Sequence, residues 1–363
     1  MNSSFSFGEN FRITVFGSSH GPHVGVEIEG CPNGLSIGEN EIQMELDRRK
    51  PGGSPLVSGR KEDDRLIVES GIKNGKTTGE KIRMLVKNTD AKPQHYAAFG
   101  KTPRPGHADY TAAVKYGKAE SGGGFFSGRM TAAFVMAGAI AKKLLLARGV
   151  RTLAFARQIG SVKLEGEITD QMILENTYSN DMHTADMAVA KKMSDAVKKA
   201  RNSGDSIGGI VECRINGVPA GVGEPMFGSI ESSISQAIFA IPAAKGIEFG
   251  AGFAAAGMRG SEHNDAFYSE GGKVLTRTNN AGGILGGLSS GMPIVFRVAF
   301  KPTASIFMEQ ETVNLQTMQR EKLRIQGRHD PCIAIRAVTV VENIAAICMA
   351  DILLRKEEGE HEA

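Results

Sequence analysis

Hydrophobic residues alternate with glycine and polar residues near the N-terminus of the chain. Over residues 11–28 the alternation involves mainly β-branched side chains and is interrupted at residues 18–22. A period of two predicts a strand, a tight loop and a second strand. Hairpins are expected again over residues 62–87, and a second strand-rich half over residues 207–300.

Other segments repeat their hydrophobic residues with the helical period of about 3.6. At residues 39–48, for example, Ile42 and Leu46 lie one helical turn apart. The segment 130–147 is apolar on all sides, which is typical of a helix inside a core. The predicted helices are 39–48, 106–116, 130–147, 185–200, a segment near 229–239, and 342–354.

The order of these elements indicates the fold class. Helices and strands alternate irregularly, which favours an α+β fold over a doubly wound sheet. No stretch rich in proline and serine divides the 363 residues, so we expect a single domain over residues 1–363. The charged end, at about residues 356–363, is expected to fray.

Composition narrows the classes of protein that fit this pattern. Hydrophobic residues make up 41% and charged residues 23% of the chain, as in a globular protein with a sizeable core. A net charge of +3 gives no reason to expect nucleic-acid binding. The cysteines Cys31, Cys213, Cys332 and Cys348 lack the spacing of metal ligands, so no metal site is expected.

The N-terminal residues and the most apolar segment bear on where in the cell the protein works. Residues 1–11 lack the basic and apolar regions of a secretory signal. The segment 131–146 contains Lys142 and Lys143 and is shorter than the roughly 20 residues that a bilayer span needs. We therefore expect a reduced, cytoplasmic protein that does not enter a membrane.

Two histidines lie in turns marked by glycine. His20 follows Ser18 and Ser19 in the loop between the first two strands, and His107 follows Pro105 and Gly106 at the start of a predicted helix. Such positions let a ligand reach the imidazole, and two of them together indicate general acid or base chemistry. For His20 alone, a histidine exposed in a surface turn is the alternative.

Three further segments suit a phosphate or a ring system. Residues 121–129 place three consecutive glycines before a helix, although they match neither GxxxxGK[ST] nor GxGxxG, and a flexible linker is the alternative. Residues 301–305 offer a cation and two hydroxyls around Pro302. In residues 327–332, Arg328 precedes Asp330 by two positions, which suits an anion beside a carboxylate base or a buried structural ion pair.

The charges of these candidates point to an anionic ligand. The candidate site residues Arg49, Arg104, Arg129, Lys301 and Arg328 are all cationic. Asp330 is the main acid expected near them. Because unpaired buried cations are unfavourable, the sequence predicts that several negative charges are bound there.

Taken together and in this order, the segments resemble the chorismate synthase family. The resemblance runs from about residue 8 to residue 351 and rests on three signatures, at residues 17–21, 122–131 and 327–331. Supporting matches lie at residues 47–52, 104–110, 280–287 and 301–305.

The resemblance implies a β-α-β sandwich and a trans-1,4 elimination of phosphate from 5-enolpyruvylshikimate-3-phosphate. The product is chorismate, in the shikimate pathway of aromatic amino acid biosynthesis. Reduced FMN is implied as cofactor, without net redox change between substrate and product. A homotetramer is also implied. The chain has no added domain for reducing flavin with NADPH, so we expect an external reductant.

The resemblance also implies residue roles. His20 would protonate the departing phosphate, His107 would maintain the protonation state of the reduced flavin, and Asp330 with Ser19 would serve proton removal. Substrate anions would be held by Arg49, Arg104, Arg129 and Arg328. The residues implied to line FMN are Phe125, Phe126, Ser127, Gly286, Lys301, Pro302, Thr303, Ala304, Ser305 and Arg328.

Some positions depart from the family pattern. Many members have Glu at Ser18, an Arg-Ser-Ser run at residues 125–127 and Glu at Met130, and some have an arginine near Pro55. At Phe125 and Phe126 the aromatic rings are expected either to cover the flavin or to anchor the following helix in the core. A different flavin-dependent oxidoreductase and an inactive flavin-binding paralogue are the alternative functions.

Overall fold

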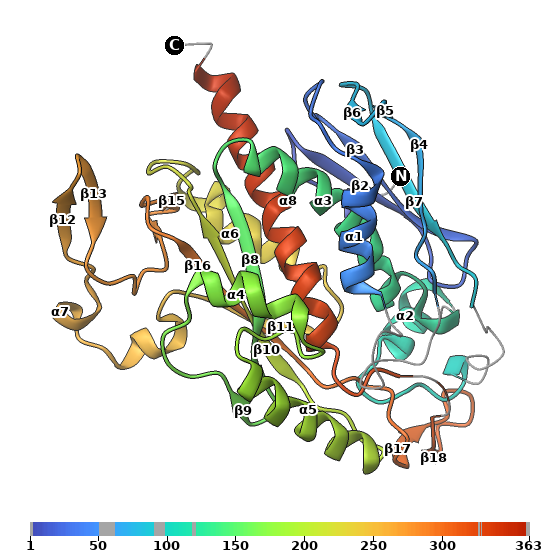
Figure 1. The fold of residues 1–363 in the computed structure, drawn as a ribbon. Coiled ribbons are helices and arrows are strands. Elements are labelled where there is room, and N and C mark those ends of the chain that lie inside the picture. The colour runs from blue at the N-terminus through green and yellow to red at the C-terminus, as the bar shows by residue number, and fades with distance from the viewer. Residues whose placement is uncertain are drawn as a thin grey trace.

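Two five-stranded antiparallel sheets form the outer layers of the molecule (Figure 1). The computed structural model describes residues 3–50, 62–90, 99–117, 121–325, 327 and 329–360. The first sheet has the order β1-β2-β3-β7-β4, with bounds Ser6–Phe7, Arg12–Gly17, His23–Glu29, Ile82–Lys87 and Leu66–Ser70. The second has the order β11-β16-β10-β8-β9, with bounds Ala244–Phe249, Ile294–Phe300, Gly209–Asn216, Arg151–Ile159 and Val162–Lys163.

A layer of helices separates the two sheets (Figure 1). It consists of α1 (Glu39–Arg49), α3 (Thr131–Leu146), α6 (Ile230–Ile238) and α8 (Ala334–Glu360). Helix α3 packs on β2, β3 and β7 of the first sheet, whereas α8 packs on β8 and β10 of the second. Because α3 and α8 also pack on each other, the helices join the sheets into the expected β-α-β sandwich of the α+β class.

The alternating pattern at the N-terminus explains how the first sheet buries one face. In β3, Val24, Val26 and Ile28 are fully buried, and they pair in register with Val86, Met84 and Ile82 of β7. These side chains belong to one hydrophobic core that extends through both sheets and the helix layer. The hairpin predicted at residues 11–28 is confirmed by β2 and β3.

Helix α8 is longer than the helix predicted at residues 342–354. It begins at Ala334, in a stretch whose β-branched residues have low helix propensity, and it is helical there because its sides are buried. Among the described residues, only the Ala334–Arg355 part of α8 is long and apolar enough to cross a membrane. Since 94% of its apolar window is buried inside the protein, it serves here as a core helix.

Some other elements begin at a different residue than predicted, and some were not predicted from the sequence at all. Helix α2 (Asp109–Tyr116) begins three residues late, because Gly106 adopts a left-handed φ of 69°. Strand β8 and helix α4 (Asp170–Asn176) are outside the predicted set. The β8 sequence contains alanines and no sustained alternation, and it becomes a strand because it pairs along its length with β10 and packs against α8.

The remaining described elements cover surfaces or form small hairpins. Helices α4 and α5 (Met187–Asn202) pack on β8. The hairpins are β5–β6 (Ile72–Lys73, Lys76–Thr77), β12–β13 (Phe267–Glu270, Lys273–Thr276), β14–β15 (Ile284–Leu285, Leu288–Ser289) and β17–β18 (Gln310–Val313, Arg320–Leu323). Helix α7 (Gly260–His263) precedes β12.

Candidate active site

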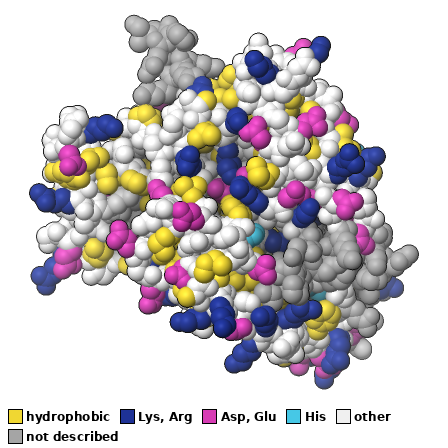
Figure 2. All heavy atoms as spheres, in the orientation of Figure 1, with side chains coloured by type: hydrophobic (Ala, Val, Ile, Leu, Met, Phe, Trp, Pro, Cys, Tyr) yellow, Lys and Arg dark blue, Asp and Glu magenta, His cyan; other side chains and the backbone are white. Residues whose placement is uncertain are grey.

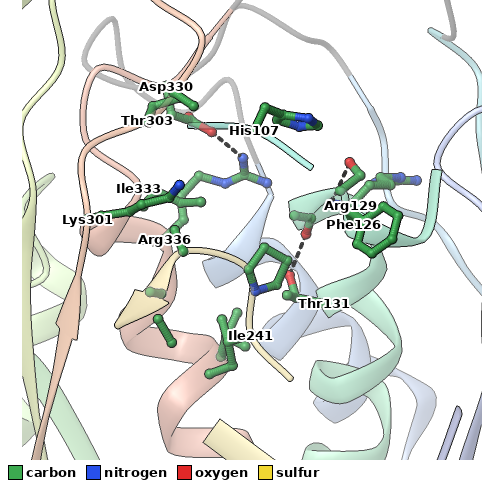
Figure 3. Close-up of a pocket in the computed structure, with 18 of the residues that line it drawn as sticks. His107, Phe126, Arg129, Thr131, Ile241, Lys301, Thr303, Asp330, Ile333 and Arg336 are labelled. Atoms are coloured by element: carbon green, nitrogen blue, oxygen red, sulfur yellow. Dashed lines mark hydrogen bonds and ion pairs between the residues drawn. The ribbon is translucent and has the colours of Figure 1, made fainter. Parts of the chain in front are cut away.

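A cavity of about 490 Å³ opens where the ends of several elements meet (Figure 3). Its walls come from the segments before α2 and α3, the link from α6 to β11, the segment after β16, and the start of α8. The predicted site residues that line it are Arg49, His107, Phe125, Phe126, Ser127, Arg129, residues 301–305 and Asp330. The fold therefore brings together most of the segments that carry candidate chemistry.

Four predicted site residues lie outside the cavity lining, and one is not described. Ser19 and His20 lie in a turn that Asn88 joins to the lining residue Arg129. Arg104 contacts the lining residues His107 and Ser305, whereas Gly286 lies in the turn of the β14–β15 hairpin. Arg328 falls outside the described residues, so its contacts with substrate, FMN and Asp330 remain predictions.

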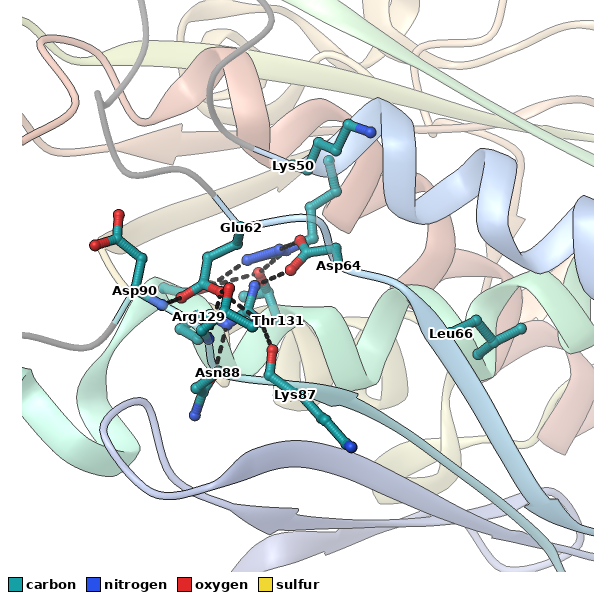
Figure 4. Close-up of polar contacts among 12 residues, drawn as sticks. Lys50, Glu62, Asp64, Leu66, Lys87, Asn88, Asp90, Arg129 and Thr131 are labelled. Carbon is teal, nitrogen blue, oxygen red and sulfur yellow. Dashed lines mark hydrogen bonds and ion pairs between the residues drawn. The ribbon is translucent and has the colours of Figure 1, made fainter.

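A buried carboxylate joins two of the predicted arginines (Figure 4). Arg49 Nη1 donates to Asp64 Oδ2 at 2.9 Å, and Arg129 Nη1 donates to the other carboxylate oxygen. Burial alone would raise the pKa of Asp64, but the two guanidinium groups hold it below its ordinary value. Glu62 lies 3.9 Å from Arg129 Nη2 and adds a second buried acid.

The third predicted arginine is also paired. Arg104 forms a bidentate ion pair with Asp109, with Nε to Oδ2 at 2.7 Å and Nη2 to Oδ1 at 2.8 Å. His107 Nδ1 lies 2.8 Å from Asp109 Oδ1, and Arg104 Nη1 donates to Ser305 Oγ at 3.1 Å. The carboxylate and the guanidinium therefore fix the orientation of His107 at the edge of the cavity.

These pairs correct the charge argument made from the sequence. Asp330 was expected to be the main acid near the site, but Asp64, Glu62 and Asp109 lie against the arginines. Lys245 and Lys301 are the lining cations that have no carboxylate partner within the described part of the chain; Lys301 Nζ donates to the carbonyl of Gly106. The excess positive charge is therefore smaller than the sequence suggested. Glu62 and Asp64, outside the recognised segments, and Asp109, within the segment 104–110, lie against the arginines.

Asp330 has a partner that sequence reasoning missed. Arg336, on the first turn of α8, donates from Nη1 to Asp330 Oδ2 at 2.8 Å and from Nε to the carbonyl of Arg49 at 3.1 Å. Arg336 also lines the cavity (Figure 3). A single cation in a long apolar segment is a signal that could have identified it.

The turn that carries His20 is tied to the cavity through Asn88. Its Nδ2 donates to the carbonyls of Ser18 at 2.9 Å and Gly21 at 2.7 Å, and its Oδ1 accepts from Arg129 Nε at 2.9 Å. Within the turn, Ser19 Oγ and His20 Nδ1 are 3.0 Å apart. Asn88 is a second residue that sequence reasoning missed, and no local signal marks it.

Phe125 and Phe126 line the cavity, and both rings are partly exposed. The exposed fraction is 43% for Phe125 and 38% for Phe126. The ring of Phe125 meets that of Phe5 edge to face, with centroids 5.0 Å apart. Neither ring is buried in the core below α3, which disfavours the alternative that they anchor this helix.

The cavity wall offers a buried hydroxyl and cationic side chains to a ligand. The hydroxyl of Thr303 is buried at the cavity wall without a hydrogen-bond partner among them, and the lysines nearby suit a phosphate. No cluster of three or more His, Cys, Asp or Glu side chains that could hold a metal ion occurs in the described ranges. The size, hydroxyls and cations of this cavity therefore fit FMN.

Known proteins resemble this chain over nearly its whole length. The profile of the chorismate synthase family matches residues 11–354. The chorismate synthase of Methanosarcina mazei is 49% identical over 350 residues, covering 96% of this chain and 96% of that protein. That of Korarchaeum cryptofilum is 46% identical over 355 residues, covering 97% of this chain and 98% of that protein.

A solved structure shows the same fold. A crystal structure of chorismate synthase superposes with a TM-score of 0.76 at 28% sequence identity, covering 96% of this chain and 93% of that one. The sequence match and the structural match both extend over nearly the whole chain. The chain belongs to the chorismate synthase family, whose members are carbon–oxygen lyases acting on phosphate.

Proposed function

We propose that the cavity binds 5-enolpyruvylshikimate-3-phosphate beside reduced FMN and catalyses the trans-1,4 elimination of phosphate to give chorismate. The observation that carries the proposal is His107, which Asp109 and Arg104 orient at the edge of a cavity lined by Lys245 and Lys301. An oriented imidazole beside cations suits proton transfer next to an anionic ligand.

FMN would lie against residues 125–127 and 301–305, which line the cavity from two sides. Reduced flavin, when bound by these residues, would supply electron density to the elimination without a net oxidation or reduction. Thr303 and Ser305 offer hydroxyls, and Lys301 offers a cation for the phosphate group. The exposed ring of Phe125 would exclude water from the flavin. Gly286 and Arg328 are further proposed contacts.

The arginines would hold the anionic groups of the substrate. Arg49 and Arg129 line the cavity, and every guanidinium nitrogen of both already donates to a protein acceptor. Only the second N–H of each Nη1 and Nη2 would be left for a carboxylate or phosphate. Arg104 does not line the cavity; its proposed part is to orient His107. Arg328 would add a further cation to the substrate contacts.

Two groups besides His107 would move protons. His20 would protonate the departing phosphate, and the link from its turn through Asn88 to Arg129 supports its closeness to the substrate. Asp330 would accept a proton with the help of Ser19, and its hydrogen bond from Arg336 holds the carboxylate in place. Proton transfer by a positioned side chain contributes about 10²–10⁴-fold to a rate.

We further propose that the protein works in the cytoplasm as a homotetramer and receives reduced flavin from an external reductant. Phosphate release under argon, with purified protein, substrate and dithionite-reduced FMN, tests the central proposal. Chorismate and phosphate should form in equal amounts, with no NADPH consumed. Stoichiometric flavin or nicotinamide oxidation would indicate an oxidoreductase instead, and FMN binding without phosphate release would indicate an inactive paralogue.

A further inference from the structure

His329 has two buried nitrogens that have no hydrogen-bond partner among the described residues. The residue lies between β18 and α8 and lines the cavity. Neither Nδ1 nor Nε2 is hydrogen-bonded to any described residue. Buried polar atoms are nearly always paired in folded proteins, because losing water without a replacement is unfavourable. Both ring nitrogens of His329 are therefore available to hydrogen-bond a ligand in the cavity.

The surroundings of His329 indicate that a ligand forms the hydrogen bonds that its ring nitrogens lack. The ring of Phe307 packs against the imidazole, with centroids 5.8 Å apart. Thr303 Oγ1, on the same cavity wall, is also buried without a partner among the described residues. Two unpaired polar side chains from separate segments thus border one cavity. This arrangement is typical of a binding site whose ligand completes the hydrogen bonds.

The charge state of His329 restricts what it can bind. Burial, together with the positive charges of Arg104 and His107, lowers the pKa of His329 to about 4, although Asp330 opposes the shift. The imidazole is therefore neutral near pH 7 and carries one N–H donor and one nitrogen acceptor. Lysine and arginine side chains in the cavity can only donate. A neutral imidazole instead suits a polar ring edge that presents both a carbonyl and an N–H group.

We propose that His329 is a further ligand-contact residue, which hydrogen-bonds the edge of the flavin ring system through its neutral imidazole. This inference rests on the proposed function, because it needs FMN in the cavity. It assigns to His329 a role separate from those proposed for Arg328 and Asp330 on either side. The substrate is the less suitable partner for His329, because its anionic groups would pair with the lysine and arginine side chains of the cavity instead.

Replacing His329 by phenylalanine tests the inference through cofactor affinity rather than turnover. Binding of oxidised FMN, and of dithionite-reduced FMN under argon, is measured by isothermal titration calorimetry. His329→Phe keeps a planar ring but removes both nitrogens. The Kd for FMN should rise at least about tenfold, or about 1.4 kcal/mol. The melting temperature of the ligand-free protein should not fall, because no hydrogen bond is lost there.

Two further variants complete the test. His329→Gln keeps a donor and an acceptor and should bind FMN more tightly than His329→Phe; it also replaces the phenylalanine variant should that protein not fold. His263→Phe, on α7 and away from the cavity lining, is the matched control and should leave the Kd unchanged. If folded His329→Phe binds FMN with an unchanged Kd, the inference about His329 is overturned but the proposed function is not. No FMN binding by the parent protein overturns the proposed function and this inference with it.

Discussion

His107 is held by two neighbours before any ligand binds. Asp109 and Arg104 contact the same ring, so His107→Ala removes an oriented imidazole while their bidentate pair remains. Both His107→Ala and His20→Ala should lower turnover by at least about a hundredfold, as expected for loss of a general acid or base. Phosphate release at saturating substrate measures the effect, and His263→Ala is the control. Full activity in either variant removes that histidine from the mechanism.

The ring of Phe125 is expected to contribute to FMN affinity. Its ring is 43% exposed and lines the cavity, so Phe125→Ala removes apolar cover from bound flavin but little from the core. FMN affinity should fall about tenfold, equivalent to about 1.4 kcal/mol, with the melting temperature of the ligand-free protein nearly unchanged. Tyr116→Ala, at an exposed position on α2 outside the cavity lining, is the matched control. Equal FMN affinity in variant and parent would falsify the flavin-cover role.

At the scale of elements, Asp64 joins α1 to the start of α3 through its two arginines. Breaking such a buried pair leaves an uncompensated charge, so Asp64→Asn should lower the free energy of unfolding by about 3–5 kcal/mol at pH 7. Asp47→Asn, in an exposed pair with Lys50, is the control and should change it by less than about 1 kcal/mol.

The same pair predicts a dependence on pH. Since the folded-state pKa of Asp64 is lowered, its stabilisation is present above the unfolded pKa of about 3.9 and is lost as pH falls through the folded value. The difference in urea midpoint between parent and Asp64→Asn should therefore shrink from pH 7 toward pH 3. A difference that stays constant over this range would show that the carboxylate charge does not stabilise the fold.

Helices α3 and α8 cross at Gly138. A Cβ atom added there would lie 2.3 Å from Asn343 Cβ and 2.7 Å from Asn343 Cα, so the helices would have to separate. Gly138→Ala should lower the free energy of unfolding by about 1–3 kcal/mol, as overpacking does. Gly260→Ala, in α7, meets no atom within 4 Å and is the control. A stabilised Gly138→Ala protein would show that the crossing adapts to the extra methyl group.

At the scale of the whole molecule, large apolar side chains are exposed on the lobe between β10 and β16. Phe227 is 94%, Phe253 82% and Phe267 63% exposed, and Figure 2 shows hydrophobic side chains on the β12–β13 hairpin. Exposed apolar surface of this kind is typical of an interface between proteins. We therefore expect this lobe to contribute to the proposed homotetramer.

Light scattering at micromolar concentration tests the assembly. The parent should have about four times the mass of the chain, which follows from the family resemblance. The double variant Phe253→Asp with Phe267→Asp should have a lower mass, because charge in an apolar interface is unfavourable. Val114→Asp, at an exposed position on α2, is the control. A monomeric parent would contradict the homotetramer, and a tetrameric double variant would place the interface elsewhere.

Features that depend only on residues close together in the sequence could be predicted from it. The hairpin of β2 and β3 and helices α1 and α3 follow from periodicity within a few residues, and their predicted bounds agree to within one or two residues. The glycine-marked turns of His20 and His107 were also visible, because turn chemistry is local. Resemblance then identified the family, since its signatures are short segments in a fixed order.

The partners of these residues were decided by the tertiary structure. Asp64 lies 65 positions from Arg129 in sequence, and Asn88 lies 70 positions from the Ser18 carbonyl that it binds. Strand β8 and the first turns of α8 take their conformation from burial, against weak local preference. Periodicity indicates which face of an element is buried, but not which distant carboxylate or amide meets it. The sequence by itself therefore determined the α+β class, several elements and the candidate chemistry, and its resemblance to a family implied the layers. Long-range packing determined how the charges of the site are neutralised.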